Sequence, residues 1–143
     1  MSHKSTTVWK NDGLKFESTV NGHKVVMDTA AGDSGAWPKI LLLSALAGCT
    51  GMDVVSILSK MKVENFELTI DADAEQTDEH PKVYHTIDVT YNFVGESLPI
   101  DKIKRAIELS QTRYCGVSKM LGETAKINTK IKINSEEIWE NYF

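Results

Sequence analysis

The sequence has few of the residues that mark several common functions. It contains two cysteines and four histidines in 143 residues, and none of them stands at the spacing of a zinc site. It also lacks the patterns G-x-x-x-x-G-K-[ST], G-x-S-x-G and H-E-x-x-H, and any G-x-G-x-x-G after a strand. These absences exclude the best-marked nucleotide-binding, serine-hydrolase and zinc-protease classes. We therefore expect no metal ion and no cofactor.

An excess of basic charge, a signal sequence and an unbroken apolar run are missing too. The net charge of -4 argues against a nucleic-acid partner, which requires a basic face. The first ten residues, "MSHKSTTVWK", contain no apolar core of a secretory signal. The longest apolar run is interrupted by Gly48, Thr50, Gly51 and Asp53, so we expect no membrane span. A cytoplasmic, reducing location follows, in which two cysteines are free thiols and not a structural disulfide.

The order of the predicted elements indicates a single α+β domain over residues 1–143. Short β-like runs near the N-terminus are separated by "NDG" and "NG", which predicts a β-meander. Two alternating runs, "FELTIDADAE" and "VYHTIDVTYNFV", predict a pair of strands with one solvated face. "LPIDKIKRAIELSQTRYC" predicts a second helix, "VSKMLGETA" a short helical piece, and "KINTKIKIN" a last strand.

A long helix is expected between these two groups of strands, from Pro38 to Lys62. Proline suits the first turn of a helix, and the apolar residues that follow cover nearly the whole circumference, so the helix should be buried almost all round. Gly48 and Gly51 favour a bend or a break in its middle. The tail also carries apolar residues that should dock on the same subunit or on a partner: Ile138, Trp139, Tyr142 and Phe143.

The two cysteines are the candidates for chemistry. A cysteine on an apolar helix is most often buried packing, but the small neighbours of Cys49 leave room for a substrate to approach its sulfur. If Gly48 interrupts the helix, Cys49 begins a new helical segment, whose N–H groups favour a thiolate. Cys115 lies beside Arg113 and directly before Gly116. Two such thiols in a reducing cell suit an attacking and a resolving thiol.

The segments "WPKILLLSALAGCTGMDVVSILSKMK" and "TRYCGVSKML" resemble the OsmC/Ohr family of bacterial hydroperoxide-reducing proteins. The resemblance extends over the whole chain in element order and is most specific at residues 41–55 and 114–121. It implies an intertwined homodimer with two long central helices between sheets and both active sites at the interface. It also implies a cytoplasmic thiol peroxidase, in which Cys49 is the peroxidatic cysteine and Cys115 the resolving one.

The sequence departs from this family at the groups that activate the thiol. Family members hold the thiolate with an arginine from the N-terminal strands and a glutamate near the start of the long helix. Here no arginine precedes Arg105, and Lys39 occupies the glutamate's place ten residues before the cysteine. Without a cation, a buried thiol has a raised pKa and reacts slowly. Lys39, Lys24 and Arg113 are the candidates for a replacement cation.

Two functions therefore remain open. In the first, the protein is a thiol peroxidase that takes a small hydroperoxide, organic or hydrogen peroxide, and a dithiol reductant as partners, through Cys49 and Cys115. In the second, it is a non-catalytic or weakly reactive relative that binds a small apolar molecule, or senses redox state, between two subunits. Gly48 is a candidate pocket residue in both.

Overall fold

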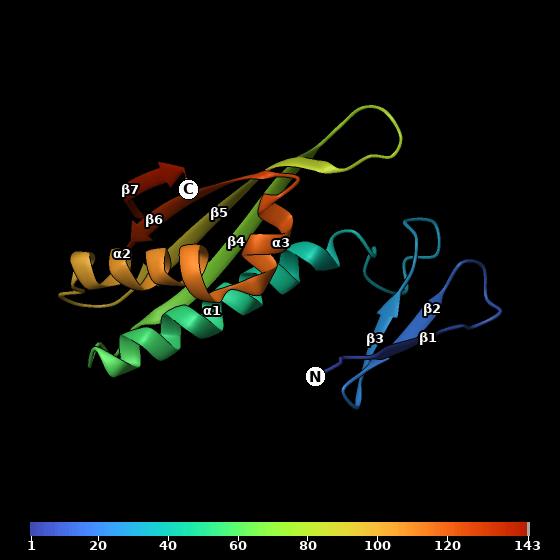
Figure 1. Cartoon of the computed structure of the whole chain (residues 1–143), viewed down its shortest axis with the longest axis horizontal. Helices are drawn as coiled ribbons and strands as arrows, with labels where there is room; N and C mark the ends of the chain where they lie inside the picture. Colours follow the sequence, from blue (N-terminus) through green and yellow to red (C-terminus); the bar gives the residue numbers. More distant parts are fainter. Residues whose placement is uncertain (143) are drawn as a thin grey trace. The chain divides into compact units, whose positions relative to one another are not determined.

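A three-stranded antiparallel sheet opens the chain in the computed structural model, which describes residues 1–142 (Figure 1). Its strands are β1 (Ser5–Trp9), β2 (Phe16–Val20) and β3 (His23–Met27), paired in the order β1-β2-β3. Asn21 and Gly22 join β2 to β3 with φ angles of 44° and 86°, the left-handed backbone that a two-residue hairpin turn requires. The predicted meander is confirmed.

The chain divides into two compact units, residues 1–42 and residues 43–143, and each is described by itself. The meander and the loop that follows it make up the first unit. Both cysteines belong to the second unit. The single domain over residues 1–143 stays a prediction.

The long helix, α1, runs unbroken from Leu41 to Lys60. A break at Gly48 and Gly51, one of the two predicted outcomes, is therefore wrong. Glycine costs roughly 1 kcal/mol relative to alanine in a helix interior, and packing of the residues on the buried side of α1 overrides this cost. The residues that are buried recur every four positions, which places them on one face: Leu46, Thr50, Val54 and Leu58.

The other faces of α1 are not covered within one chain. Met52 and Val55 are 76% and 46% exposed, so the expectation of a helix buried nearly all round is wrong for the single chain. The helix has a mean hydropathy of 1.8, and by length and composition it is apolar enough to cross a membrane. The sequence predicted the opposite, because four residues interrupt the apolar run. The core helix of a soluble protein meets the same criterion, so this property alone does not indicate a membrane span.

A four-stranded sheet lies in the second unit, with α1 and α2 (Ile100–Leu109) on the same face (Figure 1). Its strands, in the order β4-β5-β6-β7, are β4 (Glu67–Gln76), β5 (Tyr84–Val94), β6 (Lys126–Ile133) and β7 (Glu136–Tyr142). β4 and β5 form the predicted antiparallel pair. β5 and β6 are parallel, because the chain returns through the helical segments between them.

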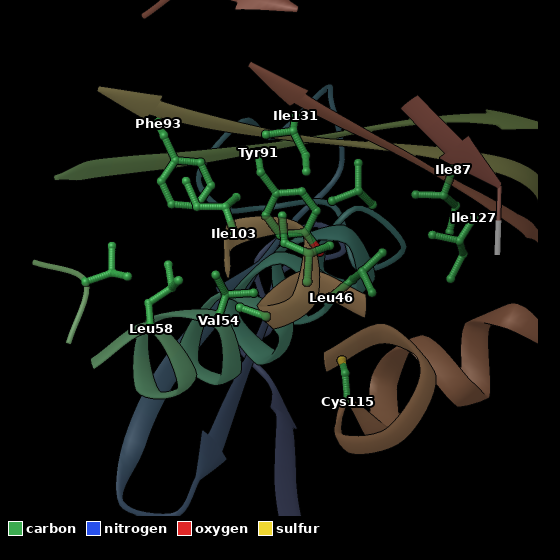
Figure 2. Packing of buried hydrophobic residues seen from close by; sticks show 14 of the residues in the cluster. Leu46, Val54, Leu58, Ile87, Tyr91, Phe93, Ile103, Cys115, Ile127 and Ile131 are labelled. Carbon is green, nitrogen blue, oxygen red and sulfur yellow. The ribbon is translucent and has the colours of Figure 1, made fainter. Parts of the chain in front are cut away.

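The core of this unit lies between the sheet and these helices (Figure 2). Alternate residues of β5 point into it, among them Ile87, Tyr91 and Phe93, and α2 contributes Ile103 and Ile107. After α2 the chain continues as a π-helical segment, η1 (Ser110–Tyr114), and then as the short helix α3 (Gly116–Gly122). This succession places Cys115 at the junction of two helical segments.

The chain does not end with the strand predicted over "KINTKIKIN". β6 is followed by β7, which pairs with it antiparallel, and Trp139 packs against the core. The Lys104 ammonium lies 5.5 Å from the centre of the Trp139 ring. Docking of the tail on its own subunit is confirmed at Trp139, while Phe143 lies outside the described residues.

Candidate functional site

Cys49 lies in the middle of α1, half-buried, on the flank of the helix beside its buried face. Because α1 is continuous, Cys49 does not stand at a helix N-terminus, and the N–H groups of its own helix are occupied by helical hydrogen bonds. The predicted activation of Cys49 by a helix start at Gly48 is therefore wrong.

Cys115 caps the N-terminus of α3. Its backbone is extended, and its sulfur accepts a hydrogen bond from the backbone N–H of Ser118 at 3.3 Å. The side chain is 3% exposed and belongs to the apolar core (Figure 2). The expected position of the second cysteine near a helix end is confirmed.

The fold brings the two sulfurs together from distant parts of the sequence. The Sγ atoms of Cys49 and Cys115 and a carboxylate oxygen of Asp53 all lie within 4.8 Å of one another. Both cysteines are free thiols, and a disulfide requires the sulfurs to approach to about 2.05 Å. A disulfide therefore requires the two sulfurs to move closer together than they lie in this structure.

The surroundings of Cys49 favour its protonated form. Burial raises the pKa of the Cys49 thiol, and its side-chain hydrogen bond with Cys115 and the negative charge of Asp53 act in the same direction. One group opposes them, since the backbone N–H of Val117 donates a hydrogen bond to the Cys49 sulfur and lowers this pKa. Val117 lies in the first turn of α3, so the helix end that assists Cys49 belongs to another element.

A chain of buried hydrogen bonds extends from Asp53 into the core. Ser110 donates its hydroxyl hydrogen to Asp53 Oδ2 at 2.9 Å, and Thr50 Oγ1 lies 2.8 Å from Ser110 Oγ and 2.8 Å from the Tyr91 hydroxyl. Gln111 Nε2 donates to the Tyr91 hydroxyl at 2.7 Å. Burial raises the pKa of Tyr91 to about 12, so Tyr91 keeps its proton. The network fixes the position of the Asp53 carboxylate.

Of the three predicted replacement cations, Arg113 belongs to the second unit, and Lys24 and Lys39 belong to the first. Arg113 is exposed, and its guanidinium lies 5.5 Å from the centre of the Tyr114 ring. Lys24 pairs with Glu17 at 3.4 Å within the first unit, to which Lys39 also belongs. The role of any of these cations as activator of Cys49 stays a prediction.

Gly48 lines a hollow on the surface of α1. The hollow has a volume of about 790 Å³ and is mainly apolar. We refer to it as the α1 groove; it is formed by Ala47, Gly48, Gly51, Met52, Val55, Ser56 and Ser59 of α1 and by Leu68 and Ile70 of β4. Cys49 is not among these residues, although its neighbour Gly48 is.

Two thiols and a carboxylate at this separation are also groups that bind thiophilic ions such as Zn²⁺. Three such side chains are one fewer than the four that close a structural zinc site. The spacing of residues along the sequence does not reveal this cluster, because only the fold brings Cys115 beside Cys49 and Asp53. The expectation that no metal is bound stays a prediction.

Comparisons with known proteins identify the family. The OsmC-like protein family matches residues 31–130, a range that contains both cysteines and Asp53. Protein YhfA of Escherichia coli K12 is 30% identical over 123 residues, which cover 85% of this chain and 92% of YhfA. The chain therefore belongs to the OsmC-like family.

Solved structures share the fold. A hypothetical protein from Aquifex aeolicus is 25% identical, with a TM-score of 0.80, and the match covers 94% of this chain and 98% of that one. The organic hydroperoxide resistance protein OhrB of Bacillus subtilis is 17% identical, with a TM-score of 0.62 and coverage of 94% and 98%. The α+β, OsmC-like fold predicted from the sequence is confirmed.

Asp53 and Ser110 are the site residues that the sequence did not reveal as such. In the sequence Asp53 stands out only as a polar interruption of the apolar run. Its spacing of four residues from Cys49 was the available signal, because residues four apart lie on the same face of a helix. No local signal marks Ser110, which reaches Asp53 from 57 residues away.

Proposed function

We propose that this protein is a cysteine-based thiol peroxidase that reduces organic hydroperoxides and also accepts hydrogen peroxide. The observation that carries the proposal is the meeting of two free thiols from distant elements, with their sulfurs within 4.8 Å. Cys49 is half-buried and Cys115 buried, so Cys49 is the thiol that a substrate can reach. The shared fold of OhrB, named for organic hydroperoxide resistance, is consistent with this assignment.

The reaction proceeds in three steps that the two sulfurs allow. Cys49 attacks the terminal oxygen of the hydroperoxide; an S–O bond forms, the O–O bond breaks, and the alcohol leaves with the thiol proton. Cys115 then attacks the sulfenic sulfur of Cys49, a disulfide forms, and water leaves. An external dithiol supplies two electrons and two protons and restores both thiols. A cytoplasmic location supplies that reductant and is part of the proposal.

Steady-state consumption of cumene hydroperoxide and hydrogen peroxide, with dithiothreitol as the dithiol, tests the proposal. We expect the wild type to consume cumene hydroperoxide, and Cys49→Ser to lose this activity. Ser44→Ala, an exposed position on the same helix outside the α1 groove, is the matched control and should retain it. Equal rates for the wild type and Cys49→Ser would contradict the proposal.

A second function has its own support. Burial raises the pKa of Cys49, the cation of the family pattern is missing, and the α1 groove offers an apolar surface. These features suit a weakly reactive relative that binds a small apolar molecule. Absence of peroxide turnover, together with saturable binding of a fluorescent apolar probe that Met52→Glu abolishes, would favour it over the peroxidase.

A further inference from the structure

Asp53 is the ionisable group that the fold places beside both thiols. It follows Cys49 by one helical turn on the same flank of α1, and one of its carboxylate oxygens lies within 4.8 Å of each sulfur. A carboxylate is a proton acceptor and, once protonated, a proton donor. The Asp53 carboxylate is therefore close enough to accept a proton that either cysteine releases.

The carboxylate is held in place by buried groups. Ser110, which is fully buried, donates to Asp53 Oδ2 at 2.9 Å, and its own oxygen lies 2.8 Å from Thr50 Oγ1. Thr50 is bound in turn to the Tyr91 hydroxyl of β5 at 2.8 Å. An acid or base held by locked neighbours keeps the geometry that proton transfer needs. The arrangement leaves little freedom for the carboxylate to turn away.

The state of Cys49 makes such a group necessary. Its surroundings raise the pKa of this thiol, Asp53 itself contributing to the rise, so at neutral pH the sulfur carries its proton. A protonated sulfur has to lose that proton as it attacks, and the departing oxygen has to gain one. The titratable groups that shift the pKa of Cys49 are Asp53 on α1 and Cys115 at the start of α3, and Tyr91 on β5 interacts in turn with these two groups. Tyr91 keeps its proton, and Cys115 is itself a reactant.

We infer, on the basis of the peroxidase function proposed above, that Asp53 is the proton acceptor and donor of the thiol pair. In the first step Asp53 takes the proton of Cys49 as the S–O bond forms, and returns it to the alkoxide released by cleavage of the O–O bond. In the second step it takes the proton of Cys115 as the disulfide forms, and returns it to the departing hydroxide as water. Cys49 sulfur is oxidised by two electrons and the hydroperoxide is reduced by two.

The variant Asp53→Asn distinguishes proton transfer by Asp53 from a purely electrostatic effect. The two roles predict opposite changes in the rate of peroxide reduction when the pKa of Cys49 falls. Asparagine keeps the shape and an oxygen that Ser110 can donate to, but accepts no proton. Loss of the negative charge lowers the pKa of Cys49, because the charge of Asp53 raises it. If Asp53 transfers protons, the rate of peroxide reduction nevertheless falls, by about 100-fold for a lost general acid–base.

The experiment measures both quantities on the full chain, with a chelator present to remove adventitious metal ions. The Cys49 pKa comes from the pH dependence of alkylation in the Cys115→Ser background, and the rate constant from single-turnover reaction with cumene hydroperoxide. We expect Asp53→Asn to lower the pKa and to lower the rate constant. Asp101→Asn, an exposed position on α2, should change neither. A rate constant in Asp53→Asn equal to or above that of the wild type overturns the inference.

Two further arms separate this inference from the function on which it rests. Asp53→Glu keeps a carboxylate one methylene longer and should regain part of the rate lost in Asp53→Asn, which a change in folding alone would not produce. If the wild type does not react with hydroperoxide, the proposed function fails. Disulfide formation by diamide, which also removes a proton from each thiol, then decides on Asp53: a slower reaction in Asp53→Asn supports the inference, and an unchanged one overturns it.

Discussion

At the scale of single residues, the environment of Cys49 differs from the one that its family pattern implies. Burial, the neighbouring Cys115 thiol and the charge of Asp53 all raise the pKa of Cys49, and the Val117 amide alone opposes them. A hydrogen bond from one amide is worth less than the combined cost of burying a charged sulfur near a carboxylate. Cys49 is therefore a protonated thiol at neutral pH.

This gives a prediction for the reactivity of Cys49. In Cys115→Ser, the rate of alkylation by iodoacetamide should rise with pH through a pKa above the ordinary value of about 8.5, because the thiolate is the reacting form. Burial, the largest cause of the shift, persists in this variant. The measurement is the alkylation rate from pH 6 to 10. A pKa below about 7 would reveal an activator that this account lacks.

At the scale of elements, three parts of the chain meet at the hydroxyl of Thr50. It links α1 to Tyr91 of β5 and to Ser110 of η1. All three side chains are fully buried, so their polar atoms depend on one another for hydrogen bonds. The network therefore fixes the register of α1 against the sheet as well as the position of Asp53.

Thr50→Val should destabilise the protein by about 1–3 kcal/mol, because the shape is retained while the Tyr91 and Ser110 hydroxyls lose a buried partner. Urea unfolding followed by circular dichroism measures the change. Thr69→Val, at an exposed position of β4, is the control and should lie within about 0.5 kcal/mol of the wild type. An equally small effect of Thr50→Val would show that the network contributes little to folding.

At the scale of the whole molecule, the exposed apolar side of α1 is expected to pack against a second protein surface. Met52 is 76% exposed in the single chain, and the α1 groove beside it is mainly apolar. Burial of one such side chain is worth about 1.5–3 kcal/mol. We predict that the protein is an obligate homodimer with α1 near the two-fold axis, the assembly that resemblance to the OsmC/Ohr family implies.

Analytical ultracentrifugation tests this assembly. The wild type should sediment as a dimer at micromolar concentration, and Met52→Glu should weaken the dimer at least tenfold, since about 1.4 kcal/mol corresponds to a factor of ten. Met120→Glu, on α3 and 67% exposed, should leave the dimer unchanged. A folded wild-type monomer would refute the prediction.

The sequence predicted the parts of the fold that depend on local patterns. Alternation in β5 and the Asn21–Gly22 turn were sufficient for their strands, because period and turn chemistry are local properties. It misjudged α1 at Gly48 and Gly51, where helix propensity was overridden by packing. The sequence identified both cysteines as candidates, but it did not predict that Asp53 and Ser110 lie at the same site. Their contact spans 57 residues and exists only in the folded chain.

The proposed function requires Cys49 and Cys115 to act as one redox pair. Mass spectrometry after one equivalent of cumene hydroperoxide, with no reductant present, tests it most directly. The account predicts that the wild type loses two hydrogens and yields a single peptide pair joined through Cys49 and Cys115, while Cys115→Ser carries a sulfenic or further oxidised Cys49. Wild-type protein in which Cys49 is oxidised to sulfenic acid while Cys115 remains a free thiol, or in which neither cysteine reacts, would contradict it.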